Sequence, residues 1–270
     1  MGKIFSIEEM TVFDGPGVRM SIFLKGCPLR CVWCHSPEGQ RSESEMIRAL
    51  SGCLQCGNCL IGGKLLPESA ARCPKGLVRE CGGEFTAEEV SRRVEELGAL
   101  LDGVTFSGGE PLMQGPFLLE CLQALEGKIH RAVQTCGYAD VETFAQILQH
   151  VELVLMDLKL MDPTDHRRFT GVDNAPILAN FCRLAQSGVP FITRVPLIPG
   201  ITDGVENLTA IACFLKENGV SYVELLPYNT MAGAKYAALG RRWKPPYDET
   251  VPCNPHGEIW ENYGIEVKIL

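Results

Sequence analysis

The stretch Met20-Ser-Ile-Phe-Leu-Lys-Gly-Cys-Pro-Leu-Arg-Cys-Val-Trp-Cys-His35 joins an apolar run to three closely spaced cysteines. The run Met20–Lys25 predicts a buried strand, and Cys27, Cys31 and Cys34 follow it with C-x3-C-x2-C spacing. Such a loop can wrap three thiolates around one face of a cubic iron–sulfur cluster and leave one iron without a protein ligand. Electron-transfer clusters generally use four cysteines, so an open iron favours a catalytic cluster.

Two other interpretations fit the same loop. Zinc held by three thiolates and His35 is one, but Cys34 and His35 are neighbours, and zinc ligands are usually separated by two to four residues. Coincidence is the other, because thirteen cysteines in 270 residues give roughly 0.03 chance matches to this spacing. The spacing therefore needs support from the rest of the chain.

The composition is that of an ordinary globular protein, with 46% hydrophobic and 21% charged residues. A length of 270 residues suits one large domain or a domain with a small insertion. The net charge of −8 argues against general nucleic-acid binding. Charged residues interrupt the longest apolar run, Val151–Met161, so no membrane span is expected. The N-terminal sequence lacks the apolar region of a signal peptide, so we expect a cytoplasmic protein.

Thirteen cysteines are unusual for such a chain, and eight of them lie between Cys27 and Cys81. In a cytosolic enzyme, clustered cysteines indicate metal or redox chemistry rather than disulfides. The other five are scattered singly, and we expect them to be small buried apolar residues.

After residue 84 the chain alternates short apolar runs with helical patterns. The first helix is predicted by a capping box over Thr86–Glu89, followed by apolar residues on one face. The apolar runs predict six strands that are buried on both faces, at Met20–Lys25, Gly103–Ser107, Ile129–Thr135, Glu152–Asp157, Pro190–Val195 and Ser221–Leu226. This rhythm predicts an α/β protein with a parallel sheet, open or barrel-like, and functional residues at the carboxyl ends of the strands.

Residues 51–83 break the rhythm and predict a small inserted module, which leaves 1–50 and 84–270 as the main domain. Too short for a core of its own, the module needs another source of stability. Its cysteines Cys53, Cys56 and Cys59 have C-x2-C-x2-C spacing, and Cys73-Pro74 follows. Ferredoxin-type clusters use such a triplet with a remote Cys-Pro, so Cys73 is the expected fourth ligand, with Cys81 in reserve. Zinc on four cysteines is the alternative.

The three-cysteine spacing, with an aromatic residue before the third cysteine, resembles the signature of the radical SAM superfamily. The longer string Asp14-Gly-Pro-Gly-Val-Arg19 with the cysteine loop up to Glu38 is similar to the glycyl radical enzyme activating enzymes, the group that includes pyruvate formate-lyase-activating enzyme. The resemblance covers essentially the whole chain. It includes four further motifs that each end a predicted strand: Ser107-Gly-Gly-Glu-Pro111, Asp157-Leu-Lys159, Arg194-Val-Pro-Leu-Ile-Pro-Gly200 and Leu226-Pro-Tyr228.

The resemblance implies a partial (β/α)6 TIM-type barrel with a ferredoxin-like insertion. It also implies that a [4Fe-4S] cluster on Cys27, Cys31 and Cys34 binds S-adenosylmethionine (SAM) and cleaves it reductively to a 5′-deoxyadenosyl radical. The positions that match the SAM contacts of the family are Trp33, His35, Gly108, Gly109, Glu110, Thr135, Asp157, Leu158, Lys159, Arg194 and Asn229.

Three of the motif residues or segments also have a purely structural interpretation. Trp33 could be a simple core aromatic residue, and Arg194 could pair with Asp157. The turn Asp14–Arg19 could help to dock a partner or be purely structural. Two departures from the family pattern also matter. Gln134 stands where relatives often have an acidic residue that holds a monovalent cation, and Asn229 stands where pyruvate formate-lyase-activating enzyme has histidine.

The family acts on a backbone glycine of a partner glycyl radical enzyme and receives electrons from a donor such as flavodoxin or ferredoxin. Many of its members carry two auxiliary clusters, but the five cysteines of this insertion permit only one. One alternative function is a radical SAM enzyme for a small molecule or a ribosomal peptide. Another is a non-catalytic iron–sulfur or zinc protein.

Overall fold

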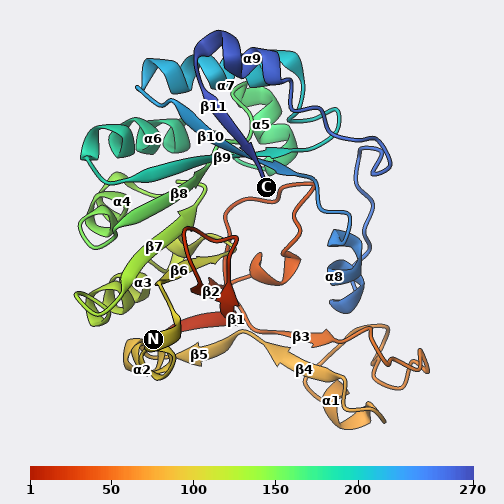
Figure 1. Cartoon of the computed structure of the whole chain (residues 1–270). Helices are drawn as coiled ribbons and strands as arrows, with labels where there is room; N and C mark the ends of the chain where they lie inside the picture. Colours follow the sequence, from red (N-terminus) through yellow and green to blue (C-terminus); the bar gives the residue numbers. More distant parts are fainter.

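The computed structural model describes all 270 residues and is built on one nine-stranded sheet (Figure 1). The strand order is β11-β10-β9-β8-β7-β6-β2-β1-β5. β2 and β6 to β11 are parallel, whereas β1 pairs antiparallel with β2 and β5 pairs antiparallel with β1. The bounds are β1 Gly2–Thr11, β2 Arg19–Leu24, β5 Gly83–Phe85, β6 Gly103–Gly108, β7 His130–Thr135, β8 Leu153–Asp157, β9 Phe191–Leu197, β10 Tyr222–Pro227 and β11 Glu266–Ile269.

All six predicted parallel strands are present, as β2 and β6 to β10, with ends that lie no more than two residues from those expected. Three further strands were not predicted: β1 and β5 at one edge and β11 at the other. Because β5 and β11 are unpaired edges, the sheet does not close. The α/β class and the partial-barrel architecture are confirmed.

The helices follow the predicted rhythm and lie mainly on one side of the sheet. In Figure 1, α2, α3, α4 and α6 cover the outer side, while the loop after β2 and α8 lie on the inner side. The predicted capping box is present: Thr86 Oγ1 accepts from the Glu89 nitrogen at 3.2 Å, and Glu89 Oε2 accepts from the Thr86 nitrogen at 2.8 Å. The bounds are α1 Ser69–Arg72, α2 Ala87–Glu96, α3 Gly115–Ala124, α4 Val141–Leu148, α5 Pro163–Thr170, α6 Ala175–Ser187, α7 Val205–Glu217, α8 Ala232–Ala238 and α9 Gly257–Tyr263.

The main core is a cluster of 38 buried apolar residues, and two clusters of three buried residues lie apart from it. β6 shows why the parallel strands read as continuous apolar runs, since five of its six residues are buried. A sheet covered on both faces leaves its side chains little access to water, so polar residues on these strands require a partner. None of the helices is long and apolar enough to cross a membrane.

The cysteine-rich segment forms a second, smaller sheet beside the first. β3 Glu45–Arg48 pairs antiparallel with β4 Val78–Cys81, and short turns and α1 connect them. In Figure 1 this unit projects from the edge of the main sheet that carries β5. The second sheet begins before residue 51, the predicted start of the insertion, and Gly83 already belongs to β5 of the main sheet.

Candidate functional site

The loop after β2 holds three cysteines, and its main chain is hydrogen-bonded on two sides. On one side the Gly26 nitrogen donates to the Gly39 oxygen at 2.8 Å, and the Gly26 oxygen accepts from the Glu110 nitrogen at 2.7 Å. On the other side the nitrogens of Arg30 and Val32 donate to the oxygens of Thr170 and Phe169, in the last turn of α5, at 2.6 and 3.0 Å. The loop is therefore fixed by peptide groups.

Gly108 and Gly109 close the gap between this loop and the end of β6. A Cβ atom on Gly109 would lie 2.3 Å from the Gly39 oxygen and 2.4 Å from the Gly26 oxygen. At Gly108, where φ is +127°, it would lie 2.3 Å from the Leu24 oxygen. Both positions need glycine for this close backbone packing, whatever further contact they make with a ligand.

Cys27, Cys31 and Cys34 are all free, and each is partly exposed. Burial raises the pKa of the Cys27 thiol to about 12, and it also raises the pKa values of Cys31 and Cys34. No three His, Cys, Asp or Glu side chains of the chain converge on a point that would suit a single metal ion. Each thiolate of a cubic cluster binds a different iron, so this donor set suits a cluster better than one ion.

Glu110 forms a buried clamp between the ends of β6 and β7. Its Oε1 accepts from Thr135 Oγ1 at 2.6 Å and from the Leu112 nitrogen at 3.1 Å, and its Oε2 accepts from the Cys136 nitrogen at 2.8 Å. Burial raises the pKa of this carboxyl, although these hydrogen bonds oppose the shift. The hydrogen bond between Glu110 and Thr135 thus joins the end of β6 to the end of β7.

Asp157 and Lys159 lie together at the end of β8. Lys159 Nζ donates to Asp157 Oδ2 at 2.8 Å. Burial alone would lower the pKa of Lys159. The charges of Asp157 and of nearby thiols raise this pKa by a larger amount, so the net shift is upward. Asp157 Oδ1 is buried and has no partner in the protein. An unpaired buried carboxylate oxygen is costly, so this atom indicates a place for a ligand's hydrogen-bond donor.

Arg194 on β9 is nearly buried, and its guanidinium contacts three groups. Nε donates to Glu224 Oε2 at 2.9 Å, Nη2 to the Phe13 oxygen at 2.7 Å, and Nη1 to Gln134 Oε1 at 3.4 Å. Register places Arg194 beside Asp157 on one strand and Glu224 on the other. The ion pair is made with Glu224, and the alternative pairing with Asp157 is absent.

The remaining predicted SAM contacts have contrasting surroundings. Trp33 is buried and packs with Leu160 and Ile198 in a small cluster apart from the main core. Leu158 is also buried. His35 is exposed, as is Asn229, whose Oδ1 accepts from the Met231 nitrogen at 2.9 Å.

The turn Asp14–Arg19 makes mainly internal contacts. Arg19 is 1% exposed and donates to Thr105 Oγ1 and to the Val104 oxygen, both at 2.7 Å. Asp14 Oδ2 accepts from Ser21 Oγ at 2.5 Å. The arginine of this motif therefore anchors the turn to the sheet.

Several charged residues that the sequence analysis missed lie next to the cysteine loop. Lys25 is fully buried, and its Nζ donates to the Glu38 oxygen at 2.8 Å and pairs with Glu45 at 3.4 Å. Glu45 also pairs with Arg241, from the segment after α8. Glu224 could have been found by the criterion that singled out Arg194, because it too is a lone charge in an apolar run.

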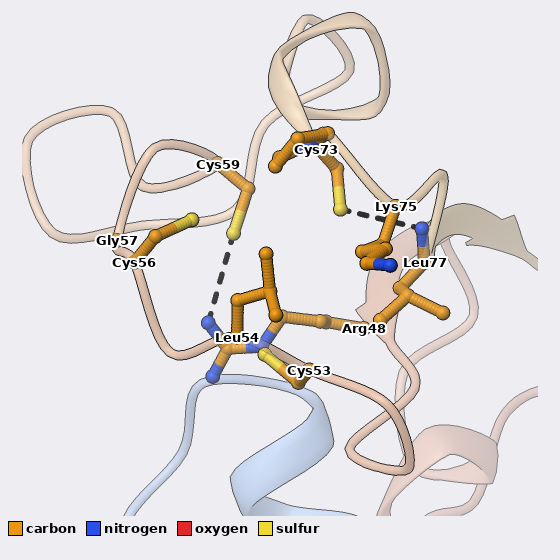
Figure 2. Close-up of a pocket in the computed structure, with 10 residues that line it drawn as sticks. Arg48, Cys53, Leu54, Cys56, Gly57, Cys59, Cys73, Lys75 and Leu77 are labelled. Carbon is orange, nitrogen blue, oxygen red and sulfur yellow. Dashed lines mark hydrogen bonds between the residues drawn. The ribbon is translucent and has the colours of Figure 1, made fainter.

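The four predicted auxiliary ligands line one cavity in the cysteine-rich segment (Figure 2). Cys53, Cys56 and Cys59 follow one another on one loop and Cys73 directly follows α1, and the four line the cavity together with Arg48 and Lys75. Cys81 does not line the cavity. It is buried on β4 with Lys25, Glu38 and Glu45 as its charged neighbours. Of the two candidates for the fourth ligand, Cys73 lines the cavity and Cys81 does not.

Nitrogen donors already point at three of these sulfurs. The Leu77 nitrogen donates to Cys73 Sγ at 3.3 Å, the Gln55 nitrogen to Cys53 Sγ at 3.4 Å, and Arg48 Nη1 to Cys59 Sγ at 3.6 Å. Main-chain N–H groups, those of Leu77 and Lys75 foremost, lower the pKa of Cys73. Hydrogen bonds of this kind stabilise thiolates and tune iron–sulfur clusters.

The family model and the relatives that this chain matches indicate the same family. Residues 21–210 match the family model of the radical SAM superfamily. The chain is 35% identical to the isethionate sulfite-lyase activating enzyme of Nitratidesulfovibrio vulgaris, over 89% of this chain and 88% of that one. It is 32% identical to the 4-hydroxyphenylacetate decarboxylase activating enzyme of Clostridium scatologenes, over 90% and 88%.

Solved structures agree. A domain of pyruvate-formate lyase-activating enzyme from Bacteroides vulgatus is 32% identical with a TM-score of 0.50, covering 62% of this chain and 98% of that one. A radical SAM methyltransferase from Sphaerobacter thermophilus shares the fold, with a TM-score of 0.55 at 16% identity, over 93% of this chain and 66% of that one.

Proposed function

The chain belongs to the radical SAM superfamily and, within it, to the activating enzymes of glycyl radical enzymes, and on that premise we propose that it cleaves SAM reductively and abstracts a hydrogen atom from a backbone glycine of a partner enzyme. One observation carries the proposal. The three-cysteine loop and the unpartnered Asp157 Oδ1 lie at the same edge of the sheet, where parallel strands end.

The donor set fits the [4Fe-4S] cluster that the family implies. Cys27, Cys31 and Cys34 would hold it as thiolates, on a loop whose main chain is already fixed. When bound, the cluster supplies an open iron for SAM and the electron that breaks the sulfur–C5′ bond, which releases the 5′-deoxyadenosyl radical. Because burial raises the pKa values of these thiols, loading the site must release protons.

The protein's own residues would bind and orient SAM. Asp157 Oδ1 is the free acceptor for a donor of the ligand, and the hydrogen bond from Lys159 to Oδ2 holds that carboxylate in place. Arg194, held by Glu224, can offer Nη1 to the methionine carboxylate, since its contact with Gln134 is long. We assign adenosine and backbone contacts to the other predicted positions: Trp33, His35, Gly108, Gly109, Glu110, Thr135, Leu158 and Asn229.

The proposed site allows a monovalent cation only with a weaker ligand than many relatives offer. Gln134 occupies the position where relatives often carry an acidic residue, and its amide oxygen accepts from Arg194. A neutral amide that already bears this contact is a weaker cation ligand than a carboxylate.

Residues 51–83 form the proposed inserted module, with one auxiliary [4Fe-4S] cluster on Cys53, Cys56, Cys59 and Cys73. The shared cavity and the N–H donors at the sulfurs support this assignment. The proposed electron donor is a flavodoxin or a ferredoxin. All thirteen cysteines are unpaired, which suits a reducing compartment, so the proposed location is the cytoplasm.

The test is anaerobic activation of the glycyl radical enzyme encoded nearest to this chain. With SAM and a reductant, the parent protein should produce a glycyl radical on the partner, seen by electron paramagnetic resonance (EPR), and 5′-deoxyadenosine in matching amount. Cys27→Ala, Cys31→Ala and Cys34→Ala should each abolish both products.

Deoxyadenosine formed with a small molecule or a peptide, and no radical on any glycyl radical enzyme, would favour the alternative radical SAM function. A reconstituted protein that binds iron but never cleaves SAM would indicate a non-catalytic role.

A further inference from the structure

Arg48, the last residue of β3, lies in the cysteine cavity without a counter-ion. Its Nη1 is 3.6 Å from Cys59 Sγ, which is the only hydrogen-bond partner of its side chain. Its Nε is buried and has no partner. The ion pairs at this edge of the protein join Glu45 to Lys25, Arg41 and Arg241, and none of them includes Arg48. Figure 2 shows the guanidinium between the turns that carry the cysteines.

A partly buried guanidinium without an anion is unfavourable, because desolvation removes water and nothing replaces it. Neutral thiols cannot supply the missing charge. Four thiolates on an iron–sulfur cluster can, since the assembly is net negative in both oxidation states and gains one more negative charge on reduction. The missing partner of Arg48 is therefore the anion that the four cysteines become when they bind metal.

We propose that Arg48 is the counter-charge of the auxiliary cluster and favours its reduced state. This inference rests on the auxiliary cluster of the proposed function and adds a residue outside the cysteine motif to it. A fixed cation beside the cluster stabilises the form with the extra negative charge, and net charge and hydrogen bonds to sulfur are the main determinants of cluster potential. Lys75, which also lines the cavity, adds to the same effect from the exposed side.

The position of Arg48 does not depend on the cysteine loops. β3 and β4 hold its backbone, with Arg48 opposite Val78. At the other end of the same strand, Glu45 pairs with Lys25, which directly follows β2 and precedes Cys27 by two residues. A four-residue strand spans roughly 10 Å between its end residues. β3 thus ties the guanidinium to the main sheet, so the cation is in place before a cluster binds.

The experiment is a potentiometric titration of the reconstituted full-length protein, followed by EPR. In the background Cys27→Ala/Cys31→Ala/Cys34→Ala, the remaining signal belongs to the auxiliary site. Arg48→Gln, which keeps a donor but removes the charge, should make reduction about tenfold less favourable, a fall of about 59 mV for one electron. Arg48→Lys should give a smaller fall. Arg79→Gln on β4, an exposed residue outside the cavity, is the matched control and should change the equilibrium less than twofold.

Metal content separates failure of the inference from failure of the proposed function. About four irons per chain in the triple-alanine background would establish the auxiliary cluster. Stoichiometric zinc in their place would show that both the auxiliary cluster and the redox role of Arg48 are wrong. Iron with an unchanged potential in Arg48→Gln would overturn the inference alone. If neither Arg48→Gln nor Arg48→Lys loads iron while Arg79→Gln does, Arg48 is needed for packing, and its role as counter-charge is wrong. Loading in Arg48→Lys but not in Arg48→Gln would support it.

Discussion

The two cysteine sites of this protein are held by different means. The loop after β2 is fixed by main-chain hydrogen bonds to β6 and α5, and charged residues surround it. The cysteine-rich segment has one two-stranded sheet and a four-residue helix, and five of its glycines have positive φ with no atom near the place of a Cβ: Gly52, Gly57, Gly62, Gly63 and Gly76. The first loop is therefore preformed by the fold, whereas we expect the turns between β3 and β4 to gain much of their order from the proposed metal.

This difference also separates the thiols. In the first site burial keeps the thiols protonated, while in the segment N–H donors stabilise a thiolate at Cys73. The first site thus has the more firmly held backbone, and the second has the thiol that ionises more readily. The two properties can be measured separately.

Removing the metals should produce the largest contrast. Chelation should speed tryptic cleavage after Lys64, Arg72 and Lys75 by on the order of 100-fold, because metal binding supplies much of the folding free energy of such modules. Cleavage after Arg30, which is exposed but lies on the hydrogen-bonded loop, should hardly change. Mass spectrometry of timed digests measures both rates. Equal acceleration at Arg30 would mean that the first loop is no more preformed than the module.

Alkylation of the metal-free protein at pH 8 should distinguish the thiols. The pKa of Cys27 is raised to about 12, so this thiol stays protonated at pH 8, whereas the lowered pKa of Cys73 gives a larger thiolate fraction. Thiolates are the reactive form, so iodoacetamide should label Cys73 on the order of 30-fold faster. Raising the pH should narrow the gap, because Cys73 is ionised first and Cys27 only near pH 12. A ratio near one at pH 8 would contradict the assigned environments.

Gly109→Ala tests the backbone packing of the first site. The new methyl group would collide with the oxygens of Gly39 and Gly26, and overpacking of this kind costs about 2 kcal/mol. The urea midpoint should fall accordingly, with loss of iron from the first site. Gly98→Ala is the control, since a Cβ there meets nothing within 4 Å. Similar urea midpoints for the two variants would show that the backbone around Gly109 can move to accommodate the methyl group.

Glu224→Gln should have the smallest effect. The change removes the charge that orients Arg194 but leaves a side-chain acceptor, so we expect SAM binding to weaken by about tenfold, or about 1.4 kcal/mol. Calorimetric titration of SAM into the loaded protein gives the affinity. Glu266→Gln, an exposed acid on the neighbouring strand β11, is the matched control. An unchanged affinity in Glu224→Gln would mean that Arg194 needs no orienting partner.

Much of the main sheet follows from local sequence. Parallel strands that are buried on both faces are continuous apolar runs, so β6 and β8 could be located, and with them Asp157 and Lys159 at a strand end. β11 was missed because it has only four residues, three of them exposed, which is too short for the alternation of Glu-Val-Lys-Ile to stand out. α5 was missed because Pro163–Thr170 carries almost no apolar face; its start is set by Asp162, which accepts from the nitrogens of Thr164 and Asp165.

The partners of the site residues were harder to predict than their positions. Arg194 could be expected to face a carboxylate, but the choice between Asp157 and Glu224 depends on three-dimensional competition: Lys159 binds Asp157 and leaves Glu224 for Arg194. Glu110 was expected at the ligand, yet the structure shows it joining two strand ends. In the cysteine-rich segment the four cysteines chosen by spacing line one cavity, while the absence of periodicity hid Arg48, which enters from a neighbouring strand.

The cysteine loop after β2 is held by peptide groups, and this has an evolutionary consequence. The contacts of Arg30 and Val32 with α5 use backbone nitrogens, which every residue except proline possesses. These backbone contacts are kept whatever side chains stand at the two positions, while the Arg30 guanidinium adds hydrogen bonds to the oxygens of Cys27 and Leu29. The relatives that this chain resembles are named as activators of different enzymes, and a loop held in this way would keep its path if the side chains beside the cysteines changed.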